Sequence, residues 1–156
     1  MLVFKCVAFH ELTLDELYAL LRLRAEVFVV EQNCVYQDLD GKDRLAYHLL
    51  GFDKDNELVA YTRLLPKGIS YPDHPSIGRV ITSMKVRRTG AGKVLMEKSI
   101  EEMYRLFGVC DIKIGAQCYL DKFYRGLGFL PVGDEYLEDG IPHISMIRKS
   151  LESEAG

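Results

Sequence analysis

The stretch VRRTGAGKVLM, Val86–Met96, decides the fold because it joins the end of an apolar strand to the start of a long helix. Gly90 and Gly92 lower the cost of unusual backbone angles and allow a ligand to approach the main chain. A helix start leaves free N–H groups, and Arg87 or Arg88 can add charge-assisted contacts. The pattern indicates an anion site such as a phosphate site. The alternative is an ordinary glycine-rich loop before a helix.

The two best-known nucleotide-binding loops do not fit this stretch. Gly90 and Gly92 have no third glycine at the spacing of G-x-G-x-x-G, and no Lys-Ser or Lys-Thr follows them. The loop therefore belongs to neither the dinucleotide-binding fingerprint nor the P-loop.

The elements on either side of this loop follow from its flanks. "IGRVITSMKV" (77–86) predicts a strand, and the pattern from Ala91 to Phe107 predicts a helix that Gly108 ends. The apolar side chains of one face of this helix are Met96, Ile100, Met103, Tyr104 and Phe107.

Further elements extend to both ends of the chain. Thr13 and Glu16 form a capping box that starts a first helix. The apolar face predicted for this helix comprises Leu14, Leu17, Tyr18, Leu21, Ala25 and Phe28. Strands are predicted at 2–9, 45–53, 57–65, 111–117, 129–138 and 141–149, with a short helix at 119–126 and a tight Asp-Gly turn at 139–140. The order β-α-β-β-β-α-β-α-β-β implies an α/β fold with a mixed, mostly antiparallel sheet and helices on both faces.

Length and composition set the class of protein. A chain of 156 residues fits one domain, 1–150, followed by a polar tail, 151–156. A net charge of −3 argues against nucleic-acid binding, and no apolar run suits a membrane span. The first ten residues lack signal-peptide features, so we expect a cytoplasmic protein. The four cysteines form no C-x-x-C pair, which argues against zinc and disulfide-exchange sites; no metal is expected.

The pattern Arg87-x-x-Gly90-x-Gly92 resembles the acyl-CoA pyrophosphate loop of the GNAT N-acetyltransferase superfamily. "FYRGLGF" (123–129) resembles that family's short helix ending in Gly-Phe. "LYALLRLRAEVFVVEQNCVYQDLDGKD" (17–43) and "YLEDGIPHISM" (136–146) resemble its bacterial ElaA-like subfamily. Thr89 departs from the glycine or basic residue of many members, and Gln117 stands near a position that often holds Asn.

The resemblance implies an acetyl-CoA-dependent N-acetyltransferase that acts by direct attack in a ternary complex. The acceptor would be a primary amine of a small molecule, a peptide N-terminus or a lysine, and the resemblance allows a homodimer. It implies that the strand before the loop pairs its backbone with the pantetheine arm. The implied cofactor-binding residues are Val80, Ile81, Thr82, Arg87, Arg88, Thr89, Gly90, Ala91, Gly92 and Lys93.

Three residues are candidates for catalysis. The resemblance makes Tyr124 the general acid that protonates the leaving thiolate; otherwise it is a core tyrosine. His143 follows the Asp-Gly turn and suits a general base, or it is a structural histidine. Glu31, before the long loop, suits a base acting through water or a ligand for the substrate ammonium, or it caps local backbone. His48 lies in an apolar strand, and we expect it to be buried and structural.

The loop 31–43 is acidic. Asp38, Asp40 and Asp43 suit either a cationic acceptor or, individually, a solvated turn, which we favour. Arg24 and Arg63 are expected to pair with Glu31, Asp38 or Glu138, and recognition of a substrate carboxylate is their alternative role.

Two other functions stay open at this point. "RAEVFVVEQ", "DLDGKD" and "YTRLLP" also resemble N-acyl-homoserine-lactone synthases, although those chains are longer and lack the R-x-x-G-x-G loop. A non-catalytic acyl-CoA-binding regulatory module would keep the same cofactor loop.

Overall fold

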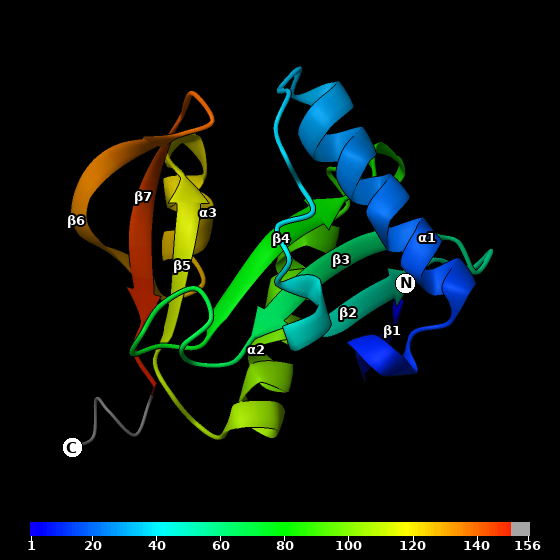
Figure 1. Ribbon diagram of the computed structural model, residues 1–156, viewed down its shortest axis with the longest axis horizontal. Coiled ribbons are helices and arrows are strands. Elements are labelled where there is room, and N and C mark those ends of the chain that lie inside the picture. Colours follow the sequence, from blue (N-terminus) through cyan, green and yellow to red (C-terminus); the bar gives the residue numbers. More distant parts are fainter. Residues whose placement is uncertain (151–156) are drawn as a thin grey trace.

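The computed structural model describes residues 1–150; the tail predicted at 151–156 lies outside the described residues. Within residues 1–150 one sheet has the order β1-β2-β3-β4-β5-β7-β6 (Figure 1). Its strands are β1 Val3–Ala8, β2 Tyr47–Phe52, β3 Leu58–Leu65, β4 Ser76–Thr82, β5 Ile112–Gln117, β6 Phe129–Glu138 and β7 Ile141–Arg148. The helices are α1 Leu14–Arg24, α2 Ala91–Phe107 and α3 Asp121–Arg125. The predicted fold class and order of elements are confirmed.

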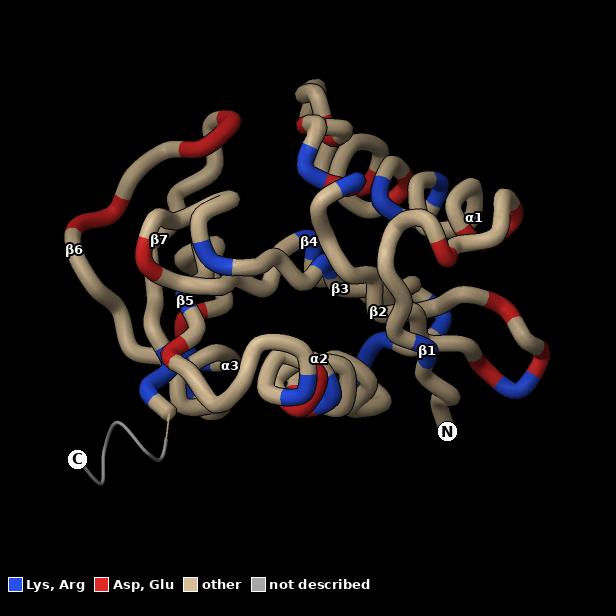
Figure 2. The backbone as a smooth tube through the Cα atoms, turned by 60° about the horizontal axis from the view of Figure 1, so that its bottom comes forward, with Lys and Arg blue, Asp and Glu red and all other residues tan. Residues whose placement is uncertain are grey.

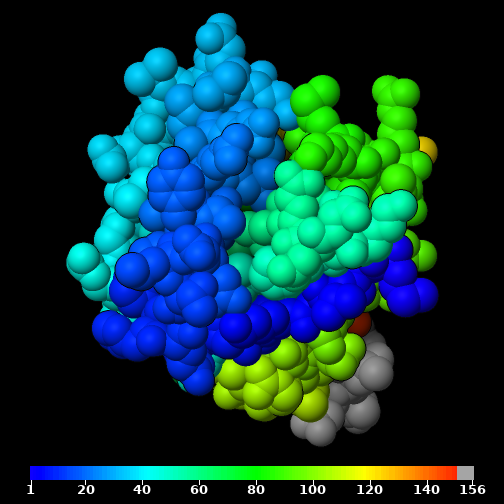
Figure 3. All heavy atoms as spheres, turned by 90° about the vertical axis from the view of Figure 1, so that its right-hand side faces the viewer, coloured from blue at the N-terminus to red at the C-terminus, as the bar shows by residue number. Residues whose placement is uncertain are grey.

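The two long helices cover opposite faces of the sheet (Figure 2). On one face, α1 packs on Leu50, Tyr61 and Ile81. On the other, α2 packs on a core that includes Leu64 and Ile77. Neighbouring residues of a strand point to opposite faces of the sheet, so one strand contributes side chains to the contacts with both helices. The edge strand β1 lies between the two layers (Figure 3).

The start of α1 is confirmed, whereas the predicted buried face was wrong except for Leu21 and Phe28, which pack partly buried against the core. Thr13 Oγ1 accepts the Glu16 N–H at 3.1 Å, and the Glu16 carboxylate accepts the Thr13 N–H at 2.9 Å. Leu14 and Tyr18 are exposed. The buried residues of this segment are Leu20, Leu23, Arg24 and Val27.

Two physical reasons explain the wrong face. The helix carries apolar side chains on more than one side, so periodicity alone does not select the buried side. Arg24 lies on that side because carboxylates from the following loop neutralise its charge. The chain also continues from α1 as a π-helix, Ala25–Glu31, whose i→i+5 hydrogen bonds break the α-helical period.

The prediction for α2 is confirmed at both ends, from Ala91 to Phe107. Met96, Ile100 and Met103 are buried, with Tyr104 and Phe107 packed against the same core. Burying side chains of this size stabilises a fold by about 1.5–3 kcal/mol each. The helix is therefore anchored against β3 and β4, and it fixes the position of the loop before it.

The sheet opens between β4 and β5, its only described parallel neighbours. Their ladder consists of one residue pair, Ser76 with Lys113, and the two strands then diverge (Figure 1). The register of β3 and β4 shifts between Tyr61 and Arg63, and Arg79 has a φ of +51° there. The strand predicted at 77–86 ends early, at Thr82, because Ser83 caps a short 3₁₀ helix, Met84–Val86.

Candidate functional site

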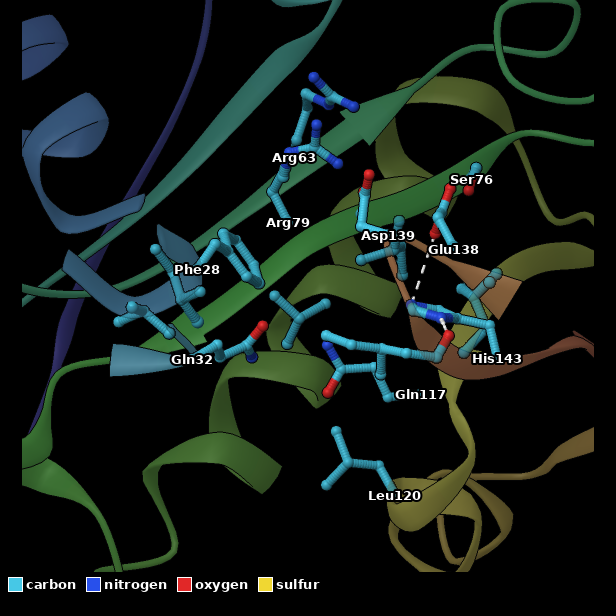
Figure 4. A pocket seen from close by; sticks show the side chains of 18 of the residues that line it. Phe28, Gln32, Arg63, Ser76, Arg79, Gln117, Leu120, Glu138, Asp139 and His143 are labelled. Carbon is cyan, nitrogen blue, oxygen red and sulfur yellow. Dashed lines mark hydrogen bonds and ion pairs between the residues drawn. The ribbon is translucent and has the colours of Figure 1, made fainter. Parts of the chain in front are cut away.

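A cavity of about 800 Å³ occupies the opening between β4 and β5. Its walls come from the π-helix, the loop 32–42, both diverging strands, α3 and the β6–β7 hairpin (Figure 4). Segments from most of the chain thus meet where β4 and β5 are no longer hydrogen-bonded to each other.

The β4 edge forms one wall of this cavity. Val80, Ile81 and Thr82, the strand positions predicted to bind the cofactor, line it. No ladder pair beyond Ser76–Lys113 joins β4 to β5 in the described chain. Backbone groups on such an edge can pair with an extended ligand in the manner of an added strand.

The loop before α2 is exposed and ends in a helix start with unused donors. Gly90 has a φ of +86°, and a Cβ there would meet no atom within 4 Å. No side chain caps the N-terminus of α2, and no acidic residue lies in its first turn. The first N–H groups of such a helix, together with its dipole, favour an anion.

Of the residues predicted to bind the cofactor through this loop, one lines the cavity and the others lie outside its lining. Arg87 lines the cavity, whereas Arg88, Thr89, Gly90, Ala91, Gly92 and Lys93 follow it outside the lining. The Thr89 hydroxyl donates to the Val86 carbonyl, which fixes the turn. The loop is thus continuous with the cavity through Arg87.

Arg87 and Glu31, predicted for different roles, pair with each other. Arg87 Nη1 lies 2.6 Å from Glu31 Oε2, and Arg87 Nη2 donates to the Thr82 carbonyl at 3.0 Å. Each side chain is about one third exposed. The pair therefore connects the end of the π-helix to the loop, and solvent or a ligand can compete with it.

Tyr124 reaches the cavity from α3 and is otherwise enclosed. Its ring lies edge-on to Phe123 and Phe129, at centroid distances of 5.1 and 5.9 Å. Burial, with a smaller effect of Tyr119, raises the pKa of Tyr124 to about 12. The phenol is protonated at neutral pH, as a proton donor must be.

His143 lies on β7, opposite Gln117 of β5 and Tyr136 of β6. Nδ1 lies 2.7 Å from the Ile141 carbonyl, which can only accept, so we assign the hydrogen to Nδ1. Nε2 lies 3.4 Å from Glu138 Oε2 (Figure 4). The ring stacks on Tyr136, and Nε2 is left as the nitrogen that can exchange a proton with a ligand.

The aspartates of the loop are bound to arginines, so the predicted solvated turn was wrong. Arg24, fully buried, donates to Asp38 at 2.9 Å and to Asp43 at 2.7 Å. Arg63 donates to Asp40 at 2.8 Å and to Asp43 at 3.1 Å. Of the partners predicted for Arg24 and Arg63, only Asp38 was right, and it pairs with Arg24.

The arginines keep Asp40 and Asp43 in their charged forms. Burial alone would raise the pKa values of Asp40 and Asp43. Hydrogen bonds and charges from Arg63 and Arg24 outweigh burial and lower both. The loop is consequently a rigid wall of the cavity.

Sequence reasoning missed Arg79, which lines the cavity and donates to Asp38 Oδ1 at 2.8 Å. Its positive φ turns the side chain toward the loop, and nothing in "IGRV" signals that conformation. Lys42, Tyr71 and Tyr136 also line the cavity and were missed. For Lys42 the signal was present, because it lies within the loop whose aspartates were considered.

His48 is buried and structural, as predicted. Nδ1 lies 2.6 Å from the Tyr61 hydroxyl and Nε2 lies 2.9 Å from the Asp43 carbonyl. Burial lowers the pKa of His48.

Gln117 lines the cavity at the end of β5.

The part of the chain that the structure describes contains neither a candidate metal-binding cluster nor a helix suited to span a membrane. Across residues 1–150, no group of three or more His, Cys, Asp or Glu side chains is arranged to hold a metal ion. None of the described helices has the length and apolar character that a membrane crossing requires.

Comparison with known proteins agrees with this geometry. A family model described as an acetyltransferase (GNAT) domain matches residues 16–150. Protein ElaA of Escherichia coli is 46% identical over 145 residues, 92% of this chain and 94% of ElaA. A UPF0039 protein of Synechocystis is 45% identical over 139 residues, 89% of this chain and 90% of its own length.

Two crystal structures superimpose closely on this chain. An acyl-CoA N-acyltransferase from Pseudomonas aeruginosa matches with a TM-score of 0.88 at 43% identity, covering 95% of this chain and 99% of the other. ElaA of Escherichia coli matches with a TM-score of 0.88 at 44% identity, covering 96% of this chain and all of the other.

Proposed function

Because the chain belongs to the GNAT acetyltransferase family, and is ElaA-like within it, we propose that it transfers the acetyl group of acetyl-CoA to a primary amine. The observation that carries the proposal is the separation of β4 and β5 after one residue pair. It opens a cavity that extends from Arg87, beside the helix-start loop, to His143.

The residues present fit an acyl-CoA. The first turn of α2 offers N–H donors with no protein acceptor, and Arg88 and Lys93 are exposed beside them. The unpaired β4 edge at Val80–Thr82 suits an extended amide-containing chain. When bound, acetyl-CoA supplies an activated thioester carbonyl.

The chain's own residues supply the proton transfers in this proposal. His143 Nε2 accepts a proton from the attacking amine, and Glu138, 3.4 Å away, stabilises the imidazolium that results. Tyr124, kept protonated by its raised pKa, donates a proton to the leaving sulfur. Both side chains line the same cavity, which the acceptor and the thioester would share.

Glu31 has a conditional role in the proposal. Its carboxylate is bound by Arg87 at 2.6 Å, so it accepts a proton through water only after Arg87 moves to another anion. His143 therefore acts as the main base. Replacing His143 with Asn and, separately, Glu31 with Gln distinguishes the two: the first is expected to lower kcat by about 10²- to 10⁴-fold, and the second to lower it much less.

The test measures thiol release from acetyl-CoA with a panel of amines, and identifies the acetylated amine by mass spectrometry. We expect turnover with at least one amine. Binding of CoA without turnover on a broad panel would instead indicate an acyl-CoA-binding module. Turnover only with acyl groups on an acyl carrier protein would indicate the chemistry of homoserine-lactone synthases.

A further inference from the structure

The part of the cavity away from the α2 loop has opposite charges on its two sides. Arg63 and Arg79 lie on one side, and Glu138, Asp139 and His143 lie on the other (Figure 4). Acidic residues also colour the tip of the hairpin between β6 and β7 (Figure 2). A cavity with one basic and one acidic wall selects ligands by their charge distribution.

The basic wall carries one positive charge more than its own carboxylates neutralise. Three arginines, Arg24, Arg63 and Arg79, are bound by three aspartates, Asp38, Asp40 and Asp43. Lys42 lines the cavity beside them, and in residues 1–150 it forms no ion pair. Its Nζ donates to the Ser70 hydroxyl at 3.2 Å, which leaves two N–H groups for an anionic ligand.

The same wall has unused donors on its arginines. Arg63 Nε is the one buried side-chain nitrogen or oxygen in the described chain that has no hydrogen-bond partner. Arg79 binds the loop through Nε and Nη2 only, so Nη1 is unused within residues 1–150. Both arginines line the cavity, and the Arg79 side chain is partly exposed, so its Nη1 can donate to a ligand.

The acidic wall is the complement of the basic one. Within the described residues neither Glu138 nor Asp139 pairs with a lysine or an arginine. The only ion-pair partner of Glu138 in that part of the chain is His143, at 3.4 Å. Between the walls, a Cβ at Gly115 would lie 2.8 Å from the Tyr136 hydroxyl and 3.2 Å from the Tyr71 hydroxyl. The glycine thus leaves room for two phenol groups at the cavity wall.

We propose that the acceptor is a free amino acid, that is, a small molecule carrying both an ammonium and a carboxylate group. Its nitrogen faces Glu138 and His143, and its carboxylate faces Lys42 and Arg79. This inference rests on the proposed function. The ammonium group first releases one proton to solvent, and the resulting amine nitrogen forms a bond to the acyl carbon as its second proton passes to His143 Nε2. The carbon–sulfur bond breaks, the sulfur takes a proton from Tyr124, and proton exchange with solvent restores Tyr124 and His143.

The test uses sets of three acceptors that share one side chain: the amino acid, its amide and the decarboxylated amine, for example phenylalanine, phenylalaninamide and phenethylamine. Several side chains are compared, because the charges do not fix that choice. We expect the best amino acid to exceed both analogues by about 10- to 100-fold in kcat/KM, the size expected for hydrogen bonds to a charged group.

Lys42→Met tests the assignment of the carboxylate. It preserves length and removes the charge, so the ratio of kcat/KM between amino acid and amide is expected to fall toward one. Lys54→Met, in the exposed turn between β2 and β3, is the matched control and is expected to keep the ratio. Equal kcat/KM for all three acceptors of every set, or a ratio unaffected by Lys42→Met, overturns the inference and leaves the proposed function intact.

A binding measurement separates this inference from the proposed function. Calorimetry with amino acids in the presence of CoA is expected to detect binding that Lys42→Met weakens about tenfold or more. If no amine is acetylated but this binding is observed, the proposed function fails while the acceptor site stands. Absence of amino-acid binding together with turnover of simple amines sinks the inference alone.

Discussion

Replacing Gly90 with Asp is expected to weaken CoA binding strongly without unfolding the chain. The position has a φ of +86°, and a Cβ placed there would have no atom within 4 Å, so the steric cost is confined to the backbone. A non-glycine residue in this conformation costs about 1–2 kcal/mol, and less for Asn or Asp. A negative charge at the start of α2 offsets about 0.3–1 kcal/mol of that cost through the helix dipole.

The introduced carboxylate stabilises the start of α2, but it weakens CoA binding, and the free energy lost in binding is larger than the free energy gained by the helix. A carboxylate about 6 Å from one phosphate charge, at an effective dielectric constant of about 20, repels it by about 2.8 kcal/mol. That energy corresponds to about a 100-fold loss of affinity. Gly90→Asn is the matched control, since it has the same shape and the same backbone strain but no charge.

Calorimetry of CoA binding and thermal unfolding test this reasoning together. We expect Gly90→Asp to be at least as stable as Gly90→Asn, with melting temperatures within about 4 °C, yet to bind CoA about 100-fold more weakly. Raising the salt concentration is expected to narrow the difference, because exposed charges are screened. Equal CoA affinity for the two variants would refute the assignment of the loop to the pyrophosphate.

Three further outcomes are expected. Tyr124→Phe lowers kcat by about 10²- to 10⁴-fold, the usual contribution of a general acid, and leaves the Kd for CoA nearly unchanged; an unaltered kcat would remove the acid role. Arg24→Met lowers the free energy of unfolding by about 3–5 kcal/mol because it removes one of the two arginine partners from each of the buried carboxylates Asp38 and Asp43, whereas Arg22→Met on the exposed side changes it by less than about 0.5 kcal/mol in denaturant titrations. The pKa of His48 is lowered in the folded state, so unfolding takes up a proton as pH falls below the ordinary value of 6.5. The free energy of unfolding then decreases by at most about 1.4 kcal/mol for each unit by which the pH falls. We expect His48→Gln to lack this pH-dependent loss of stability.

Helix α2 and the β6–β7 hairpin were predictable because their signals are local. Gly90 and Gly108 bound α2 on both sides, and the apolar period between them is regular. The Asp-Gly turn at 139–140 placed β6 and β7 side by side as predicted. Each of these features is set by residues a few positions apart, which is the range over which propensity and periodicity act.

The buried face of α1 shows where such signals fail. Arg24 was expected to pair with a carboxylate but was not placed on the buried face, yet it is fully buried. Its partners lie 14 and 19 positions later, in a loop whose composition indicates only a polar turn. The interactions that stabilise the buried arginine come from aspartates in another segment. The helix sequence by itself therefore does not show which of its faces is buried.

The difference between local signals and contacts between distant residues explains why the sequence indicates a cofactor but not an acceptor. A site built from backbone N–H groups and a free strand edge requires glycine at particular positions, and this requirement leaves a short motif, Arg87 to Gly92. The proposed acceptor side consists of side chains from the loop 36–42, β3, β4 and the β6–β7 hairpin, which the fold brings together. Arg79 turns toward the cavity only because β4 is irregular there, and Lys42 has no ion-pair partner in residues 1–150 only because the neighbouring aspartates are bound elsewhere. The proposed acceptor specificity therefore depends on charges that stay unpaired once the fold has formed, and only the three-dimensional structure shows which charges these are.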